Sequence, residues 1–167
     1  MKNIAFFLDR DGVINKERRD YVKDISEFEI IDGALEAIKL IKENGFYVVI
    51  ITNQSAINRG IISIEKLFSI HKFLSDKLLV DYKTRIDGIY FCPHTPEENC
   101  MCRKPKSGLF LQAAKELDIE LEKSVMIGDS QKDIDAAQSV GCKAVLIKNN
   151  ERLIDIVKNN LALISHR

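Results

Sequence analysis

The chain has no excess of charge of either sign, because 25 lysine and arginine residues balance 25 aspartate and glutamate residues among its 167. Such a balance creates no overall field that favours nucleic acid or an anionic membrane, so any basic site must be local. The sequence also has no apolar stretch of membrane-spanning length. Its first apolar run is broken at residue 9, too early for the core of a signal peptide. We therefore expect a cytoplasmic protein that binds neither nucleic acid nor membranes.

Cysteine is scarce, and the four cysteines are too few for a disulfide framework in a chain of this size. Three of them, Cys92, Cys100 and Cys102, fall within eleven residues, with His94 between the first two. Three thiolates and one imidazole form the ligand set of a closed tetrahedral zinc site, which leaves no position for a substrate. We therefore predict a structural zinc ion; the alternative is a set of unrelated buried cysteines.

The sequence contains no internal repeat, low-complexity segment or linker-like stretch. With 46% hydrophobic residues, a chain of this length can bury one sizeable core. These features predict a single domain over residues 1–167, which we expect to act as a monomer.

Five short apolar runs alternate with longer segments in which apolar residues recur at helical spacing. The runs are candidate strands and cover residues 4–8, 46–51, 86–91, 124–127 and 144–147. The candidate helices cover residues 33–44, 63–80, 107–117, 131–140 and 151–164. This alternation predicts an α/β fold, a doubly wound and mainly parallel sheet with helices on both faces.

Two segments do not follow the alternation. Residues 14–32 hold short apolar pairs among polar residues, which predicts a small hairpin or flap beyond the first strand. Residues 92–104 form the loop that carries the predicted zinc ligands. Neither segment is long enough for a large cap domain, so these two loops must select whatever the sheet binds.

Pairs of carboxylates follow two of the predicted strands. Asp9 and Asp11 come directly after residues 4–8, and Asp129 and Asp133 follow residues 124–127. Open α/β sheets bind ligands at the carboxyl ends of their strands, where such groups can hold Mg²⁺, attack phosphorus or exchange a proton. Alternatively, the first pair marks a turn and the second caps a helix.

Neutral donors and cations follow two further strands. Thr52, Asn53, Gln54 and Ser55 come at the end of the second strand, where hydroxyl and amide groups suit the oxygens of a phosphoryl group. The pair at residues 103 and 104, Arg-Lys, offers positive charge directly after the last predicted zinc ligand. A plain turn and a solvated surface pair are the alternatives.

Along the chain, the four strand-end groups follow the order Asp9 and Asp11, then Thr52, then Lys104, then Asp129 and Asp133. Groups in this order resemble the haloacid dehalogenase (HAD) superfamily of phosphatases, whose fold the α/β prediction matches. The resemblance implies that Asp9 is the nucleophile and that Asp11 is the general acid and base. It implies that Thr52 and Lys104 bind the phosphoryl group. It further implies that Asp9, Asp11 and Asp129 hold Mg²⁺, with Asp133 in support.

The loop with Cys-Pro-His and Cys-x-Cys-Arg-Lys-Pro resembles two groups within this superfamily. One removes the 7-phosphate of D-glycero-D-manno-heptose 1,7-bisphosphate, in the synthesis of surface-polysaccharide precursors; the other is the histidinol-phosphate phosphatases. The segments around Asp9, the flap and Thr52 favour the first group, whereas the five-residue spacer between His94 and Cys100 favours the second. A zinc-stabilised binding module without catalysis is a third hypothesis.

For the heptose group, the resemblance implies a small phosphorylated sugar as the substrate. The residues that it implies as substrate contacts are Asp20, Tyr21, Asn53, Gln54, Ser55, Arg103 and Lys104. A bisphosphate carries a second dianion far from the reacting one, and the planar fork of Arg103 suits it.

Overall fold

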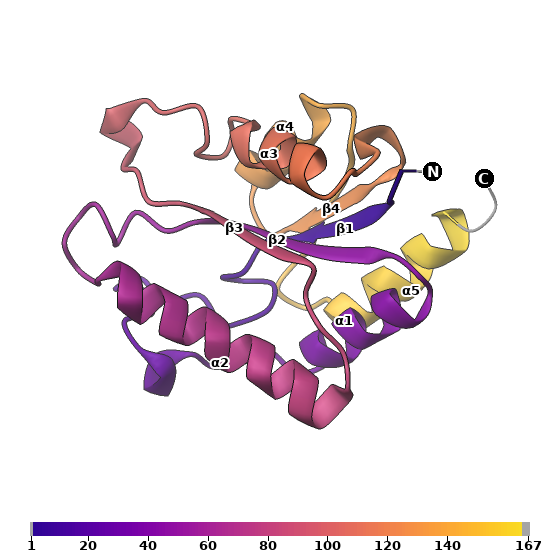
Figure 1. Ribbon diagram of the computed structural model, residues 1–167, viewed down its shortest axis with the longest axis horizontal. Helices are drawn as coiled ribbons and strands as arrows, with labels where there is room; N and C mark the ends of the chain where they lie inside the picture. The colour runs from indigo at the N-terminus through magenta and orange to yellow at the C-terminus, as the bar shows by residue number, and fades with distance from the viewer. Residues whose placement is uncertain (1, 165–167) are drawn as a thin grey trace.

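The computed structural model describes residues 2–164, and its centre is a parallel five-stranded sheet (Figure 1). The strands are β1 (Ala5–Leu8), β2 (Tyr47–Asn53), β3 (Gly88–Cys92), β4 (Val125–Gly128) and β5 (Lys143–Leu146). Their order in the sheet is β3-β2-β1-β4-β5, so the chain first runs outward from β1 through β2 to β3 and then crosses to the other side. The order therefore reverses between β1 and β4, the place where open α/β sheets bind ligands.

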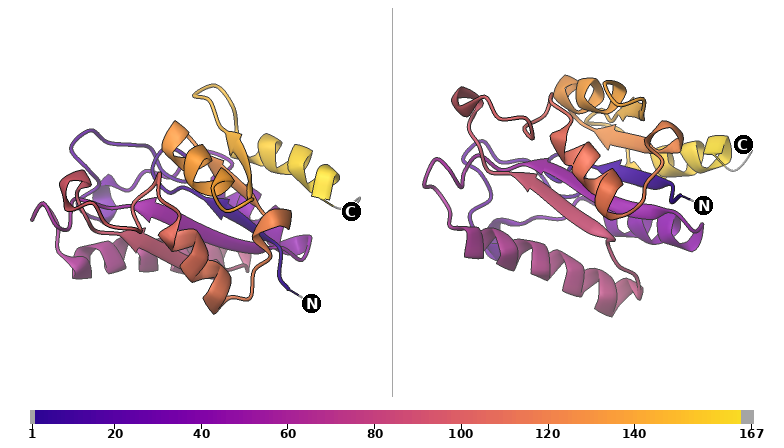
Figure 2. Two further views of the ribbon diagram at one scale, coloured as in Figure 1. Left: turned by 90° about the horizontal axis from the view of Figure 1, so that it is seen from above. Right: turned by 45° about the horizontal axis from the view of Figure 1, so that its top comes forward.

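Helices cover both faces of the sheet. They are α1 (Ala34–Glu43), α2 (Ile64–Tyr82), α3 (Gly108–Glu116), α4 (Gln131–Gln138) and α5 (Leu153–Ile164). Figures 1 and 2 show α1, α2 and α5 on one face and α3 and α4 on the other. The predicted doubly wound fold is confirmed, and residues 2–164 contain no large cap over the strand ends.

The central strands are buried on both sides, which explains their unbroken apolar sequence. Successive residues of β1 face opposite layers: Phe6 and Leu8 pack with α1, α2 and α5, whereas Phe7 packs with α3 and α4. The ring centroids of Phe7 and Phe110 lie 4.9 Å apart, and this contact packs α3 against the sheet. The sheet thus lies between two apolar clusters, one on each face, which support the strands whose ends form the site.

The segment at residues 14–32, for which the sequence predicts a small hairpin or flap, contains no strand within the described residues. The segment has antiparallel contacts only at its base, where Lys16 N donates to Glu29 O and Ile31 N donates to Ile14 O. Beyond the base it forms a loop with one 3-10 turn, Ile25–Glu27. Val22 and Phe28 both turn into the core instead of alternating along paired strands. This loop, residues 14–32, is called the flap below.

Within residues 2–164, none of the helices combines the length and apolar character that crossing a bilayer needs. His166, to which no sequence motif assigns a functional role, lies outside the described residues.

Candidate active site

Three carboxylates meet at the reversal point between β1 and β4. One oxygen from each of Asp9, Asp129 and Asp133 lies within 4.8 Å of the other two. The approach is close because Gly12, at φ +83°, has no side chain: a Cβ there would lie 1.9 Å from Asp129 Oδ2. The turn after β1 thus leaves room for the carboxylate that follows β4.

Lys104 joins these carboxylates from the loop between β3 and α3. Its Nζ lies 2.9 Å from Asp9 Oδ1 and 2.5 Å from Asp133 Oδ1, and it donates to Ile51 O at 2.8 Å. The side chain is only 2% exposed. Burial alone would lower the pKa of Lys104, but the charges of Asp9 and Asp133 raise it above its ordinary value. Lys104 is therefore a buried cation that neutralises part of the carboxylate cluster.

The remaining negative charge shows in the pKa values of the cluster. Burial is the main reason that the pKa of Asp9 is raised to about 7; Lys104 opposes the shift, and Asp133 and Asp11 add to it. Burial likewise raises the pKa of Asp129 to about 6, with further contributions from Asp133 and Glu17. A divalent cation would remove this repulsion, and carboxylate oxygens are the ligands that Mg²⁺ prefers. The donor set therefore fits Mg²⁺.

Asp11 is held apart from this cluster by three donors. Its Oδ1 accepts from Arg10 Nη2 at 3.0 Å and from Asn15 Nδ2 at 2.9 Å, and its Oδ2 accepts from Gln54 Nε2 at 2.8 Å. Burial would raise the pKa of Asp11, but the charge of Arg10 and these hydrogen bonds bring it below its ordinary value. Asp9 and Asp11 thus occupy different environments: Asp9 lies in the carboxylate cluster, and Asp11 lies among hydrogen-bond donors.

The end of β2 supplies polar groups that are already bonded within the site. Both hydrogens of the Gln54 amide are used, because Nε2 also donates to Thr52 Oγ1 at 2.9 Å. Asn53 clamps the backbone of Lys104: its Nδ2 donates to Lys104 O at 3.2 Å, and its Oδ1 accepts from Lys104 N at 3.1 Å. These residues therefore fix the lysine and the carboxylate of Asp11 in place.

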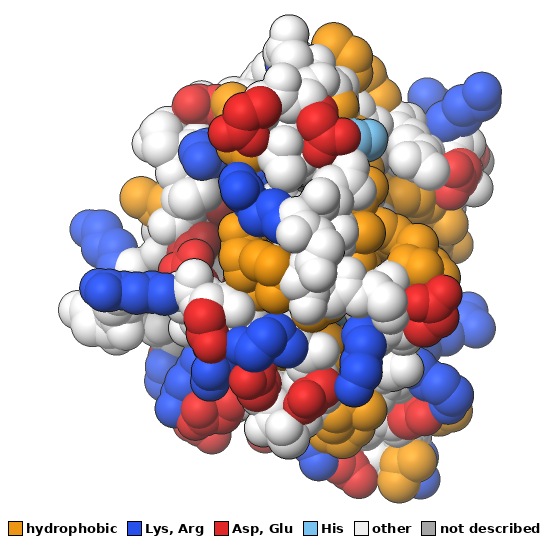
Figure 3. Space-filling model, turned by 90° about the vertical axis from the view of Figure 1, so that its left-hand side faces the viewer, with side chains coloured by type: hydrophobic (Ala, Val, Ile, Leu, Met, Phe, Trp, Pro, Cys, Tyr) orange, Lys and Arg blue, Asp and Glu red, His pale blue; other side chains and the backbone are white. Residues whose placement is uncertain are grey.

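A cavity of about 520 Å³ opens over the strand ends. It is lined by Asp9, Arg10, Asp11, Glu17, Arg18, Arg19, Tyr21, Val22, Asn53, Gln54, Ser55, Arg59, Arg103, Lys104, Asp129, Ser130, Lys132 and Asp133. Figure 3 views the molecule from the side on which Figure 1 shows the zinc-ligand loop, and basic and acidic side chains are interspersed there. The cavity brings together most of the residues that the sequence analysis selects.

Two of the residues selected for catalysis or substrate binding do not line the cavity. Asp20 lies on the flap with its side chain 62% exposed, and it pairs with Arg18 and Lys23. Thr52 is buried, and its hydroxyl accepts from Gln54. Tyr21, the neighbour of Asp20, does line the cavity and adopts a left-handed backbone at φ 64°.

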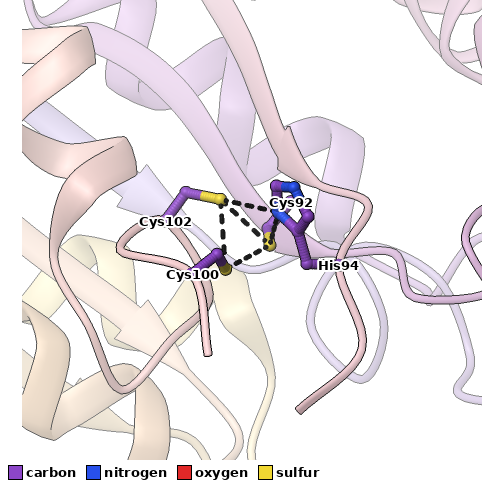
Figure 4. A group of neighbouring side chains, drawn as sticks. All are labelled: Cys92, His94, Cys100 and Cys102. Atoms are coloured by element: carbon purple, nitrogen blue, oxygen red, sulfur yellow. Dashed lines mark hydrogen bonds between the residues drawn. The ribbon is translucent and has the colours of Figure 1, made fainter. Parts of the chain in front are cut away.

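The predicted zinc ligands converge at the end of β3 and in the loop that follows it (Figure 4). The Sγ atom of Cys102 lies 3.1 Å from Cys92 Sγ, 3.5 Å from Cys100 Sγ and 3.2 Å from His94 Nδ1. All four candidate ligand atoms lie within 4.8 Å of one another. A tetrahedral Zn²⁺ with bonds of about 2.3 Å to sulfur requires edges of about 3.8 Å, so these atoms need to move little to hold it. The chemistry and spacing of the set fit zinc.

The same cluster fixes Arg103. Its backbone N–H donates to Cys100 Sγ at 3.4 Å, and its Nη1 donates to His94 O at 3.2 Å. Burial would raise the pKa of Cys100, but the hydrogen bonds from the backbone of Arg103 and from Cys102 lower it to about 6. The loop therefore ties a cavity-lining arginine to the thiolate cluster.

Arg10, His71 and Lys132 also belong to this site, although no sequence pattern singles them out. Arg10 and His71 are buried and hydrogen-bonded to each other, and Lys132 lines the cavity from α4. Position alone points to Arg10, since a charge between two aspartates directly after a buried strand is close to the site by necessity. His71 lies on an amphipathic helix with no motif around it, so only the folded chain reveals its position.

Comparison with known proteins identifies the family. A HAD-hydrolase-like family model matches residues 101–159. A D-glycero-β-D-manno-heptose-1,7-bisphosphate 7-phosphatase from Helicobacter pylori is 47% identical over 87% of this chain and 83% of its own. The enzyme of that name from Haemophilus ducreyi is 39% identical over 94% of this chain and 93% of its own.

Among solved structures, the D,D-heptose 1,7-bisphosphate phosphatase from B. bronchiseptica, complexed with magnesium and phosphate, superposes with a TM-score of 0.87. The two are 31% identical, and the match covers 98% of this chain and 99% of the other. The chain therefore belongs to the family of HAD-like hydrolases that includes the D-glycero-β-D-manno-heptose-1,7-bisphosphate 7-phosphatases.

Proposed function

We propose that this chain is a Mg²⁺-dependent phosphatase that removes the 7-phosphate of D-glycero-β-D-manno-heptose 1,7-bisphosphate. The observation that carries the proposal is the 47% identity, over most of both chains, to a relative named for that activity. The close approach of Asp9, Lys104 and Asp133 supports a working catalytic site over an inactive binding module. The named relatives favour the heptose substrate over histidinol phosphate.

In the first step, a carboxylate oxygen of Asp9 attacks phosphorus while the bond from phosphorus to the sugar oxygen breaks. Asp11 gives its proton to that departing oxygen. Lys104, 2.9 Å from Asp9, offsets charge on the phosphoryl oxygens and on the nucleophile's neighbours. Thr52 would also bind the phosphoryl group. Its oxygen accepts from Gln54, which leaves the hydroxyl hydrogen to donate.

In the second step, Asp11 takes a proton from water as the water oxygen attacks the aspartyl phosphate. The bond between phosphorus and Asp9 breaks, which releases inorganic phosphate and restores the carboxylate. Asp9, the backbone carbonyl of Asp11 and Asp129 would hold Mg²⁺, and Asp133 would hold Lys104 through the contact at 2.5 Å. When bound, Mg²⁺ would neutralise the phosphoryl oxygens and the clustered carboxylates.

The rest of the sugar bisphosphate would occupy the cavity between the flap and the zinc-ligand loop. Tyr21, Asn53, Gln54 and Ser55 line it, and the guanidinium of Arg103 is suited to the distal 1-phosphate. Asp20 would need to leave its partners Arg18 and Lys23 to reach a substrate. The proposal also takes residues 1–167 as one domain of a monomeric cytoplasmic enzyme in nucleotide-heptose precursor synthesis.

The substrate assignment predicts a large kinetic preference. We expect kcat/KM for heptose 1,7-bisphosphate to exceed that for histidinol phosphate by roughly 10²-fold or more, because only the bisphosphate offers a second dianion to Arg103. Phosphate release from both anomers of the bisphosphate and from histidinol phosphate, measured side by side, tests this. A preference for histidinol phosphate would overturn the substrate, while leaving a phosphatase.

The zinc assignment predicts one tightly held zinc ion per chain. We expect Cys102→Ser to lose most of the zinc and to lower the thermal midpoint by roughly 4–8 °C, the equivalent of about 2 kcal/mol in a domain of this size. Elemental analysis and thermal unfolding measure both quantities. The matched control is Cys142→Ser, which changes the buried cysteine outside the cluster and should keep the zinc. Carefully purified protein without zinc would contradict the assignment.

A further inference from the structure

Arg10 is a charged side chain with no exposed surface, placed between the proposed nucleophile and the proposed acid. Burying a cation is unfavourable unless its charge and its donors are satisfied. Arg10 Nη2 donates to Asp11 Oδ1 at 3.0 Å, and its Cζ lies 5.7 Å from the centre of the Phe28 ring. Its Nε has no hydrogen-bond partner within residues 2–164. The position is costly, which points to a use for the guanidinium.

His71 fixes the other end of the guanidinium. Nη1 of Arg10 lies 3.2 Å from His71 Nε2, and an arginine has no acceptor, so the histidine nitrogen must accept. His71 is therefore neutral, with its proton on Nδ1. Burial and the charge of Arg10 agree with this, because they lower the pKa of His71 to about 3. Helix α2 thus holds Arg10 through a histidine in one fixed tautomer.

The consequence falls on the two oxygens of Asp11. Oδ1 accepts two hydrogen bonds, from Arg10 and from the buried Asn15, whereas Oδ2 accepts one, from Gln54. Because Oδ1 already accepts two hydrogen bonds, it has little room for a proton, and Oδ2 is the oxygen with a lone pair available. The rotation of the carboxylate is fixed by donors from three segments of the chain.

We propose that Arg10 is a positioning residue for Asp11, held in place by His71 and Phe28, and that it directs proton exchange with the leaving oxygen to Asp11 Oδ2. The inference rests on the proposed phosphatase chemistry and adds the groups that aim its acid. It also gives a role to the buried histidine of α2. Phe28 belongs to the flap, so the same guanidinium contacts the flap, α2 and the acid.

Two variants separate positioning from charge. His71→Leu removes the acceptor and Arg10→Lys removes the fork, yet both keep a cation beside Asp11. His71→Gln restores an acceptor near the position of Nε2. The measured quantity is the release of the phenol in a single turnover, with enzyme in excess, from a series of aryl phosphates whose phenols differ in pKa. Leaving groups that depart without a proton do not need Asp11 in this step.

We expect His71→Leu and Arg10→Lys to slow release from phenyl phosphate by roughly 10-fold to 10²-fold and from p-nitrophenyl phosphate by less than about threefold. We expect His71→Gln to recover most of the loss. The ratio between the two esters comes from one preparation, so a misfolded fraction cancels. An equal loss for all leaving groups, or no loss for phenyl phosphate, would overturn the proposal. A wild-type preference for a substrate other than heptose bisphosphate would contradict only the substrate assignment, because the aryl series does not depend on it.

Discussion

Replacing Asp9 by asparagine is expected to lower kcat by on the order of 10⁴-fold or more, because an amide cannot form the covalent intermediate on which the proposed reaction depends. The substitution keeps the size of the side chain. The amide oxygen can still accept from the Arg10 backbone N–H, which donates to Asp9 Oδ1 at 2.8 Å. The variant should therefore fold and keep its zinc while losing chemistry, and phosphate release measured at saturating substrate and Mg²⁺ tests this.

The matched control is Asp76→Asn, which removes one carboxylate from the exposed face of α2, where Asp76 pairs with Lys72. It should keep kcat close to the wild-type value. Near wild-type turnover by Asp9→Asn would show that the aspartyl phosphate is not formed at residue 9. If Asp9→Asn instead lost its zinc or had a lowered thermal midpoint, its defect would be one of folding.

The fold could be predicted because its central strands are buried on both faces and are therefore apolar throughout. Their ends were harder to place, as β3 shows. The apolar run begins at residue 86, but the ladder begins at Gly88, which pairs with Val49. The side chain of Asp87 accepts from Val48 N at 2.7 Å and from Lys42 Nζ, so a carboxylate takes the place of a strand partner. A sequence pattern carries no sign of such a bond.

The strand-end rule brought the catalytic candidates together for a physical reason: the carboxyl ends of β1 and β4 are neighbours in a parallel ladder. The flap has no such rule. Its apolar residues come as short pairs among polar residues, a pattern that does not show that Val22 and Phe28 are both buried. Nor does it show that ion pairs of Arg18 and Lys23 with Glu27 hold the loop. Tertiary contacts decide its shape, and they also decide where Asp20 lies.

Replacing Lys104 by methionine is expected to lower kcat by roughly 10³-fold, because the site loses the one buried ammonium that contacts both Asp9 and Asp133 among the described residues. It should also lower the free energy of unfolding by about 3–5 kcal/mol near pH 8, since removing one partner leaves buried carboxylates without compensation. Chemical denaturation without added Mg²⁺ measures the second effect. Lys72→Met, an exposed lysine on α2, is the matched control and should change stability by less than about 0.5 kcal/mol.

The loss of stability in Lys104→Met should depend on pH with a definite sign. Burial already raises the pKa of Asp9 from 3.8 to about 7 against the opposing charge of Lys104, so removing that charge raises it further. Between the unfolded and the folded pKa, the native state then binds a proton that the unfolded state does not, and stability falls as pH rises. The variant should therefore lie closest to the wild type near pH 5 and lose most above pH 7. A loss that is equal at pH 5 and pH 8 would mean that the methionine acts through packing, and that the charge of Lys104 is not what keeps Asp9 and Asp133 together.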